Sequence, residues 1–485
     1  MMKPFQRTLF AVIVLSSLTR GLYAQASIDT IRSSGHSSKR INLVFLSEGY
    51  TKSQLPRFLD DAGNMLSSIL STEPYAEYKN YFNAFAISIA SKESGSDHPS
   101  TGIYRDTYFQ STFEAGGIAR LIGITGTGYQ RANELLMNLK PEYDHAIMIV
   151  NDSVYGGSGG TIALTSIHPA SSKVVIHEFG HSMAFLADEY SDAIPNPPSI
   201  EKPNVTTETR RDFIKWKIWI DASTPTPTPQ DNPYRNVVGL FEGANYRATG
   251  WYRPKYTCIM RSLGSPFCEV CSEAIVLSLY ERIRPIESFD PMTGSVEIRD
   301  TSSHDLTVRL MKPATHLLST EWFLNGQRRS TLAPDTLRID SRTLSDGLHA
   351  ADVKVIDTTS LVRNDPLKLL QQNLRWDVIV QRTTDTEALT SDAGQEHLAS
   401  FNYPNPFSNR TTIYYRLPSR GYVKVEAFDV LGRTIGIVAE GIQESGFHAY
   451  PFSPIAERTS PGSEMYFYRV TTDRGTLVRK MLRVR

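Results

Sequence analysis

The sequence has few cysteines, no excess of charge of either sign and no apolar run long enough to cross a membrane. Its 485 residues include 51 basic and 51 acidic side chains, so the formal net charge is zero. Nucleic acids and anionic membrane surfaces select proteins with a basic excess, so the overall charge does not favour either partner. The hydrophobic fraction of 40% and the charged fraction of 21% are typical of a folded, soluble chain. At about 150 residues per domain, the length predicts roughly three domains.

The longest apolar run, TLFAVIVLSSL, lies at residues 8–18. A membrane-spanning helix needs about 20 apolar residues, so this run is too short for one, and we expect no transmembrane segment. The basic segment MMKPFQR precedes the run, and LYAQA follows it with small residues at Ala24 and Ala26. This order predicts a signal peptide over residues 1–24 and an exported mature chain that starts near Gln25. We therefore expect the protein to be secreted or attached to the cell surface.

The three cysteines lie close together, at Cys258, Cys268 and Cys271. An exported protein can keep disulfides, but an odd number of cysteines leaves one thiol over. The segment CEVC could form half of a structural zinc site, yet the chain has no second Cys pair to complete a four-cysteine site. We therefore predict a local disulfide among these three residues, with the pairing left open.

Changes of pattern along the chain predict its domains. Residues 27–285 alternate helical and extended segments, which is typical of an α/β or α+β domain. Residues 286–382 contain short alternating strands separated by turns, which favour an immunoglobulin-like β-sandwich. Residues 383–398 are polar and predict a linker. Residues 399–485 are again rich in strand patterns and predict a small C-terminal β-sandwich.

The stretch SSKVVIHEFGHSMAFLADEY, residues 171–190, combines two histidines and a glutamate with apolar residues. The pattern predicts a buried helix, and a helix turns by about 100° per residue. His177 and His181 therefore share one face, and Glu178 lies next to it. Burying a carboxylate without a partner costs several kcal/mol, in order of magnitude. A divalent metal removes this cost, because neutral imidazoles bind it and the glutamate holds the metal's water.

The spacing H-E-x-x-H is that of a zinc hydrolase. It predicts one catalytic Zn²⁺ with His177 and His181 as ligands and Glu178 as the general base. Zinc lowers the pKa of its water towards about 7 and polarises the scissile carbonyl, so that peptide bonds are hydrolysed without a covalent intermediate. The alternative is a pair of hydrogen-bonded histidines on a structural helix.

A catalytic zinc needs a third protein ligand, and the sequence leaves its identity open. In metzincin-type peptidases the motif continues with a glycine and then a histidine or aspartate, but Ala184 and Ala187 stand at these positions. Asp188 is the first choice and Glu189 the second. On a continuous helix Asp188 would lie about 10 Å along the axis from His181, so it can bind only if the chain leaves the helix and folds back. A remote glutamate such as Glu273 is a further candidate.

Several segments resemble the bacterial IgA-peptidase family of zinc metallopeptidases over residues 40–380 or so. These are HEFGHSMAFLADEY together with CIMRSLGSPFCEVC, LSEGYT, SKESGSDHP and YGGSGGTIAL. The resemblance implies a metzincin-like catalytic domain in which Met260 forms the turn beneath the metal. It also implies an edge strand that pairs with extended substrate, formed by Thr161, Ile162, Ala163 and Leu164.

The C-terminal part resembles the sorting domain of type IX secretion, through FNYPNPFSNRTTIYYRLP (401–418), VKVEAFDVLGR (423–433) and the end of the chain. This resemblance implies export across an outer membrane and makes the secretion machinery a partner. The combined prediction is a secreted zinc endopeptidase with a protein or peptide substrate and no nucleic-acid partner. Two alternatives remain: a surface adhesin on a peptidase fold with catalysis lost, and a zinc amidohydrolase acting on amides other than those of proteins.

Overall fold

A computed structural model of the chain describes residues 26–194, 196–299, 302–331, 333–382, 398–454, 464–473 and 475–483. The predicted signal peptide lies outside the described residues, and so does the predicted linker except for Leu398. The chain is multidomain and mixed α/β, with more strand than helix. It divides into two compact units. Of the described residues, the first unit contains those within 26–287, 310–319 and 355–372, and the second contains those within 288–309, 320–354 and 373–483. In the described ranges, no helix is both long and apolar enough to cross a membrane.

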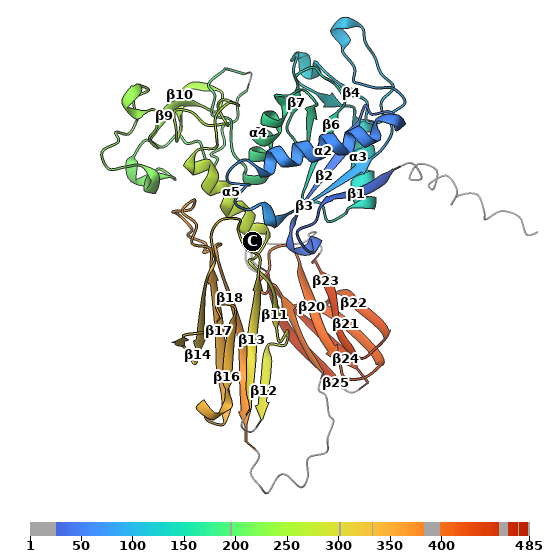
Figure 1. The fold of residues 1–485 in the computed structure, drawn as a ribbon, viewed down its shortest axis with the longest axis vertical. Coiled ribbons are helices and arrows are strands. Elements are labelled where there is room, and N and C mark those ends of the chain that lie inside the picture. Colours follow the sequence, from blue (N-terminus) through green and yellow to red (C-terminus); the bar gives the residue numbers. More distant parts are fainter. Residues whose placement is uncertain are drawn as a thin grey trace, which may run out of the picture. The chain divides into compact units, whose positions relative to one another are not determined.

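A six-stranded sheet forms the centre of the first unit, in the order β1-β3-β2-β6-β8-β7 (Figure 1). The four inner strands run parallel, and β1 and β7 are antiparallel to their neighbours. All eight residues of β2 are buried, as expected for a parallel strand covered on both faces. The strands are β1 (Ser27–Arg32), β2 (Ile41–Glu48), β3 (Phe82–Ser88), β6 (His145–Val150), β7 (Gly157–Ser158) and β8 (Ile162–Ser166).

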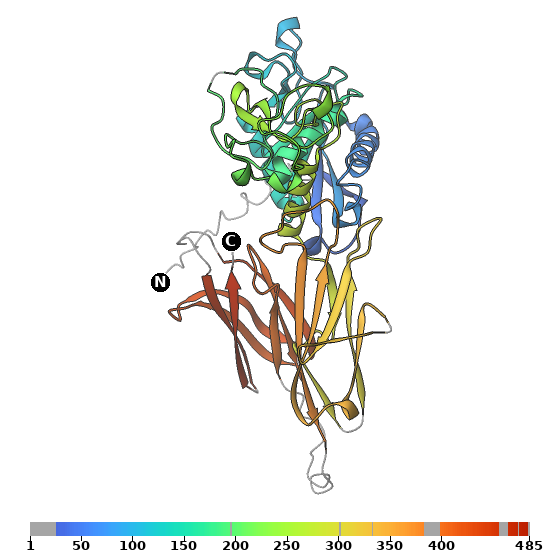
Figure 2. The ribbon, with the colours of Figure 1, turned by 90° about the vertical axis from the view of Figure 1, so that its left-hand side faces the viewer.

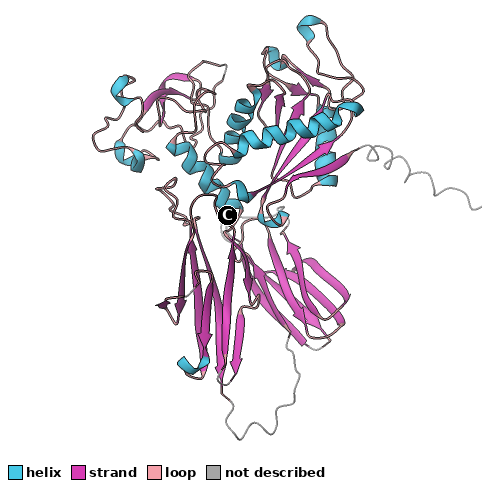
Figure 3. Ribbon diagram, viewed as in Figure 1, coloured by secondary structure: helices cyan, strands magenta, loops and turns pink. Residues whose placement is uncertain are grey.

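Helices cover both faces of this sheet, because alternate residues of each strand point to opposite sides. On one side, Leu43 and Phe45 of β2 share a core with α2 (Leu55–Leu70), α4 (Ser171–Ala184) and α5 (Glu269–Arg282). On the other side, Val44 and Leu46 pack with α3 (Gly126–Leu139). The first unit also holds two small sheets, formed by β4 (Ser111–Thr112) with β5 (Gly123–Ile124) and by β9 (Phe241–Ala244) with β10 (Arg247–Arg253). The four described α-helices all lie in this unit (Figure 3).

Two segments from the range of the predicted β-sandwich belong to the first unit, and a buried polar cluster accounts for this. His316 contacts Glu77 through Nδ1 at 2.7 Å and Asp357 through Nε2 at 2.6 Å. Asp357 also accepts hydrogen bonds from the hydroxyls of Tyr78 and Tyr280. These contacts connect residues 310–319 and 355–372 to the rest of the first unit.

The second unit consists of strands in two pairs of sheets (Figure 2). The first pair has the orders β11-β13-β16 and β12-β18-β17-β14-β15, and its buried face includes Trp322 and Trp376, whose rings stack at 5.7 Å. The strands are β11 (Ile286–Asp290), β12 (Ser295–Arg299), β13 (Ser303–Leu310), β14 (Ser319–Leu324), β15 (Gln327–Arg329), β16 (Thr336–Asp340), β17 (Gly347–Ile356) and β18 (Gln371–Gln381).

The C-terminal pair of sheets has the orders β19-β20-β23 and β22-β21-β24-β25. One apolar core joins them, with Ile413 and Tyr415 from the first sheet and Val425, Tyr468 and Met481 from the second, so this part is a small β-sandwich. Its strands are β19 (Ala399–Tyr403), β20 (Thr411–Leu417), β21 (Gly421–Asp429), β22 (Thr434–Gln443), β23 (Gly446–Phe452), β24 (Glu464–Thr472) and β25 (Gly475–Arg483).

Candidate metal centre

Helix α4 carries the H-E-x-x-H motif and follows directly after strand β8. Val175, Phe179 and Met183 are buried in the core beneath the helix, which fixes the direction of its other faces. The helix begins at Ser171 with Ala170 as the residue before it, so neither Ser171 nor Ser172 caps it by a side-chain hydrogen bond. The Ser171 hydroxyl instead lies 2.8 Å from that of Ser166 at the end of β8.

The chain leaves α4 abruptly after Ala184. Phe185 has the left-handed conformation, with φ +55° and ψ +28°. Its N–H donates to the carbonyl of His181 at 3.0 Å, and the N–H of Leu186 donates to that of Gly180 at 3.4 Å. The first of these bonds is that of the αL motif, which ends a helix at a left-handed residue, and the second holds the chain that follows against the helix. The turn begins one residue later than the glycine of the metzincin pattern, so the next carboxylate returns to the helix at Asp188 rather than at position 187.

Three electron-pair donors meet at this point. Nε2 of His177 lies 3.0 Å from Oδ1 of Asp188, Nε2 of His181 lies 3.4 Å from the same oxygen, and the two Nε2 atoms are 3.1 Å apart. Ligand atoms about 2.0–2.1 Å from a tetrahedral zinc lie about 3.3–3.4 Å from each other. The three separations therefore fit a metal of this size without rearrangement of the side chains.

The opposite ring nitrogens set the orientation of both histidines. Nδ1 of His177 donates to the carbonyl of Ile259 at 3.0 Å, and Nδ1 of His181 donates to that of Leu186 at 2.7 Å. A carbonyl can only accept, so in the neutral rings both Nε2 atoms carry lone pairs that point towards Asp188. Burial opposes ionisation of Asp188, but the contacts with the rings of His177 and then His181 lower its pKa well below the usual range. Burial lowers the pKa of His181, and the contacts with Asp188 outweigh this and raise it. A positive charge between the two Nε2 atoms and Oδ1 of Asp188 is therefore favourable.

Glu178 lies beside this group, between α4 and the loop that follows β7. Burial raises the pKa of its carboxyl, although both histidines oppose the shift. A methyl group at Gly159 would lie 2.0 Å from Oε2 of Glu178, so the absence of a side chain at Gly159 makes room for the carboxylate.

Met260 is fully buried and lies next to α4. A methyl group at Gly180, between the histidines on α4, would lie 3.0 Å from its Sδ. The carbonyl of Met260 accepts from the N–H of Glu189 at 2.8 Å, and the carbonyl of the preceding residue holds His177. The segment around Met260 therefore contacts the helix of the motif and the strand-like segment that carries Asp188.

The other two candidates for a third ligand have different surroundings. Glu189 is fully buried and points to the three cysteines, since successive residues of an extended segment face opposite ways. Glu273 accepts hydrogen bonds from the Trp219 indole and, at 2.9 Å, from the Asn364 N–H. Only Asp188 of these three carboxylates joins the group with His177 and His181.

Two tyrosines at this site are absent from the sequence-based prediction. The Tyr246 hydroxyl donates to Oδ2 of Asp188, and the Tyr190 hydroxyl donates to that of Tyr246 at 3.3 Å. Burial, followed by the hydrogen bond to Asp188, raises the pKa of Tyr246 to about 12. Tyr246 occupies the tip of the β9–β10 hairpin with φ +63°, and its N–H donates to the carbonyl of Tyr190 at 3.0 Å. No sequence signal links this hairpin, 58 residues later, to Asp188.

A further strand covers only part of the predicted edge strand, Thr161 to Leu164. Strand β8 pairs with β6 on one side, from Ile162 onwards, and Leu164 pairs with Ser158 of β7 on the other. The outermost strand is therefore β7, but it pairs only with Leu164 and Thr165, so the pairing of the residues before them with substrate stays a prediction. The sequence YGGSGG does not indicate strand β7, because two residues among glycines are typical of a loop. A side chain at Gly157 would collide with the Leu164 carbonyl at 2.9 Å.

The three cysteines are buried as free thiols, so the structure contains none of the possible disulfides among them. Sγ of Cys258 and Sγ of Cys271 are 3.7 Å apart, whereas a disulfide bond is about 2.05 Å long.

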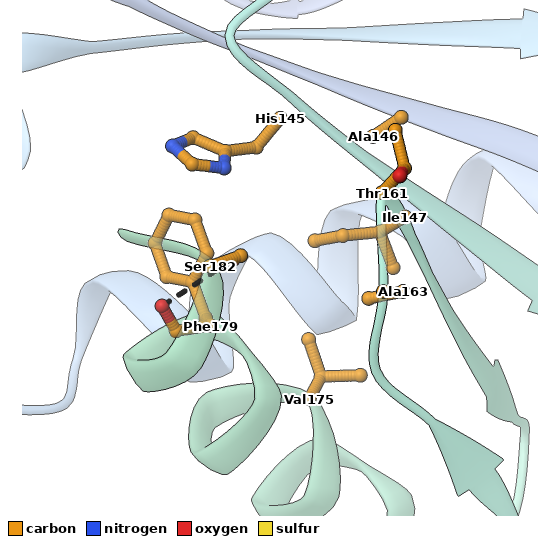
Figure 4. Close-up of a pocket in the computed structure, with 9 residues that line it drawn as sticks. His145, Ala146, Ile147, Thr161, Ala163, Val175, Phe179 and Ser182 are labelled. Carbon is orange, nitrogen blue, oxygen red and sulfur yellow. Dashed lines mark hydrogen bonds between the residues drawn. The ribbon is translucent and has the colours of Figure 1, made fainter. Parts of the chain in front are cut away.

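A small pocket lies between α4 and the strands β6 and β8 (Figure 4). His145 contacts the ring of Phe179 edge-on at 5.1 Å, and Ser182 donates to the Phe179 carbonyl at 3.4 Å. Burial, with a smaller contribution from Arg282, lowers the pKa of His145 to about 3, so this ring is neutral. The pocket belongs to the interface between helix and sheet and takes no part in the metal group.

Comparison with known proteins places the first unit in a family. Residues 30–234 and 230–279, together more than half of the chain, match the family described as IgA Peptidase M64. None of the curated proteins compared with the chain matches it.

Solved structures resemble parts of the chain at low similarity. Latent PorU from Porphyromonas gingivalis is 16% identical with a TM-score of 0.19, over 53% of this chain and 25% of that one. The β-glucuronidase of Parabacteroides merdae is 10% identical with a TM-score of 0.18, over 53% and 29%. The titin domains Z1Z2 in complex with telethonin are 12% identical with a TM-score of 0.14, over 41% and 94%. The chain thus spans about a quarter of the length of PorU.

Proposed function

The chain belongs to the IgA peptidase M64 family and is therefore a peptidase, and on this premise we propose that it is a secreted zinc-dependent endopeptidase. His177, His181 and Asp188 hold one catalytic Zn²⁺, and Glu178 is the general base. The family's name refers to immunoglobulin A, and nothing in this chain specifies that substrate.

One observation carries the metal assignment. Two imidazole nitrogens and a carboxylate oxygen converge within 3.0–3.4 Å, and both imidazoles donate their Nδ1 protons to backbone carbonyls in the opposite direction. Three lone pairs at these distances repel each other unless a cation lies between them. Two histidines and one carboxylate are a common protein ligand set of catalytic zinc.

A zinc ion at this position supplies Lewis acidity for the scissile carbonyl and lowers the pKa of a water molecule. The chain's own residues then carry out the proton transfers. Glu178 accepts the proton of the attacking water at its carboxylate and delivers it to the leaving amine nitrogen. The raised pKa of its buried carboxyl favours this exchange, because the protonated form is easily reached.

Supporting residues hold this constellation in place. The carbonyls of Ile259 and Leu186 fix the ring planes of the histidines, and Tyr246 holds the outer oxygen of Asp188, so that Oδ1 faces inwards. Buried Met260 lies against Gly180 of the same helix, which fits the metzincin-like turn that the sequence resemblance implies.

We further propose that the C-terminal β-sandwich, residues 399–485, directs export through type IX secretion, so that the peptidase acts outside the cell or on its surface. The support comes from the sequence resemblance and from the order of residues in the N-terminal segment.

The function is tested by comparing zinc content and casein cleavage for the wild type and two carboxylate variants. Asp188→Ala should lose one zinc per chain relative to wild type together with its activity, whereas Glu273→Ala should keep the wild-type zinc content. Loss of zinc from the Glu273 variant alone would identify a remote glutamate as the ligand. A wild-type protein that binds zinc but cleaves no member of a protein and peptide panel would favour the amidohydrolase or the adhesin.

A further inference from the structure

A second group of side chains that could bind a metal lies next to the group of His177, His181 and Asp188. Cys258, Cys268, Cys271 and Glu189 each offer one ligand atom, and these four atoms all lie within 4.8 Å of one another. All four residues are buried, and Glu189 and Cys271 are fully inaccessible to solvent. A disulfide would use only two of these residues, so it gives no reason for the other two to be buried here.

The distances within this group match a tetrahedral sulfur–oxygen site. With Zn–S bonds of about 2.3 Å and a Zn–O bond of about 2.0 Å, the S···S separation is about 3.8 Å and the S···O separation about 3.5 Å. Sγ of Cys258 and Sγ of Cys271 are 3.7 Å apart, and Sγ of Cys271 lies 3.3 Å from Oε1 of Glu189. The first separation is far from that of a disulfide, which needs about 2.05 Å.

Glu189 gives an independent indication of a ligand. Its Oε1 accepts from the Asn204 amide at 2.9 Å, but its Oε2 is buried and has no hydrogen-bond partner in the described part of the chain. A buried carboxylate oxygen without a partner is costly, and a disulfide between two of the cysteines would leave both this oxygen and the third thiol buried without a partner. A metal ion held by the Glu189 carboxylate lies next to both of its oxygens, so it is a common partner for Oε2 and for the three thiols.

We propose that Cys258, Cys268, Cys271 and Glu189 bind a second zinc ion, which has a structural role and no open position for substrate. The three thiols release their protons to solvent as three Zn–S bonds and one Zn–O bond form. The four anionic ligands leave a net negative charge. Buried Arg253 interacts electrostatically with Glu189, and the N–H of Cys268 donates to Sγ of Cys258 at 3.3 Å, so both offset this charge.

Residues of this second site are neighbours in the chain of residues that form the catalytic site, so the second site stabilises the first. Glu189 follows Asp188 directly in the chain, and Cys258 precedes Ile259, whose carbonyl orients His177. A metal that joins Glu189 to Cys258 therefore fixes the relative position of the two segments that hold catalytic ligands. Through Cys268 and Cys271 the metal also connects the first turn of α5 to these two segments.

The decisive experiment isolates the second metal by removing the first. The His181→Ala variant is produced with zinc, dialysed and analysed for metal content, X-ray absorption at the zinc edge and free thiols after unfolding without reductant. We expect about one zinc per chain with sulfur in its coordination shell, three free thiols, and about two zinc ions in the wild type. A zinc-free variant, or one free thiol beside a disulfide, would overturn the proposal.

A cysteine variant provides the reciprocal arm. Cys268→Ser should lose one zinc relative to wild type, while Ser262→Ala, an exposed change in the same turn, should keep both. If Cys268→Ser does not fold, the His181→Ala variant still shows whether the cysteine group binds zinc, because that variant keeps all three cysteines. The outcome is independent of peptidase activity: sulfur-bound zinc in a chain that cleaves nothing would uphold this site and refute the proposed function alone.

Discussion

The turn at Phe185 is the local feature on which the position of Asp188 depends, and its strain is measurable. A non-glycine residue in the left-handed region costs about 1–2 kcal/mol, because Cβ approaches the following carbonyl. Replacing Phe185 by glycine removes that cost but adds about 0.4–1 kcal/mol of backbone entropy to the unfolded state. Phe185→Gly should therefore be about 0.5–1 kcal/mol more stable than Phe185→Ala.

The comparison with alanine isolates the backbone. The Phe185 side chain is 57% exposed, and its ring lies 5.7 Å from Nζ of Lys202, so both variants lose the same modest contact. Lys173, exposed on the same helix, is the matched control. There the order should reverse, with alanine more stable than glycine by about 0.5–1 kcal/mol.

Urea unfolding followed by a probe in the first unit measures all four variants. Both Phe185 variants should keep the zinc content of wild type. If Phe185→Gly were no more stable than Phe185→Ala, the left-handed residue would not be Phe185, and the explanation for the shifted ligand at Asp188 would fail.

Three further outcomes follow from the contacts. Tyr246→Phe removes the donor to the outer oxygen of Asp188, the proposed third ligand. Competition with a chelator should therefore show an affinity for the catalytic zinc reduced by about 10–100-fold, and unchanged affinity would exclude a supporting role. Gly159→Ala places a methyl group 2.0 Å from Oε2 of Glu178, which displaces the carboxylate. We expect kcat/KM to fall at least about tenfold while the zinc content stays constant. Activity equal to that of wild type would mean that the carboxylate adapts freely. Burial lowers the pKa of His316, but the hydrogen bond to Asp357 outweighs this effect, so the pKa of His316 is raised on folding. The protonated ring therefore stabilises the folded state fully below about pH 6.5, and this stabilisation is lost as the pH rises through the folded-state pKa. His316→Gln should thus reduce urea stability more at pH 6 than at pH 9, and an equal loss at both would contradict the ionic contribution.

The sequence predicted those parts of the site that depend on local periodicity. His177 and His181 share a face of α4 because they are four residues apart, and the alternating segments correctly indicated a mixed α/β, multidomain chain. The position of Asp188 depends on a left-handed phenylalanine, and the sequence pattern around Phe185 contains no glycine to mark it.

Long-range features were beyond the reach of the sequence. Tyr246 reaches Asp188 through a hairpin from a distant segment, and the role of Glu189 beside the cysteines appears only when α5 and the turn before it are packed together. Strand β7 was missed because it is two residues long and lies among glycines, which sequence patterns assign to loops. The signal peptide, the sorting role and the location outside the cell remain predictions.

The central claim is that the buried trio of α4 forms a catalytic metal site, and Glu178→Gln tests it most directly. This change keeps the size of the side chain and removes its ability to accept a proton. Zinc content and casein cleavage are measured on the same samples of wild type and variant. The account predicts wild-type zinc content in the variant and a fall in kcat of about 10²–10⁴-fold. Cleavage at the wild-type rate by the glutamine variant would contradict it.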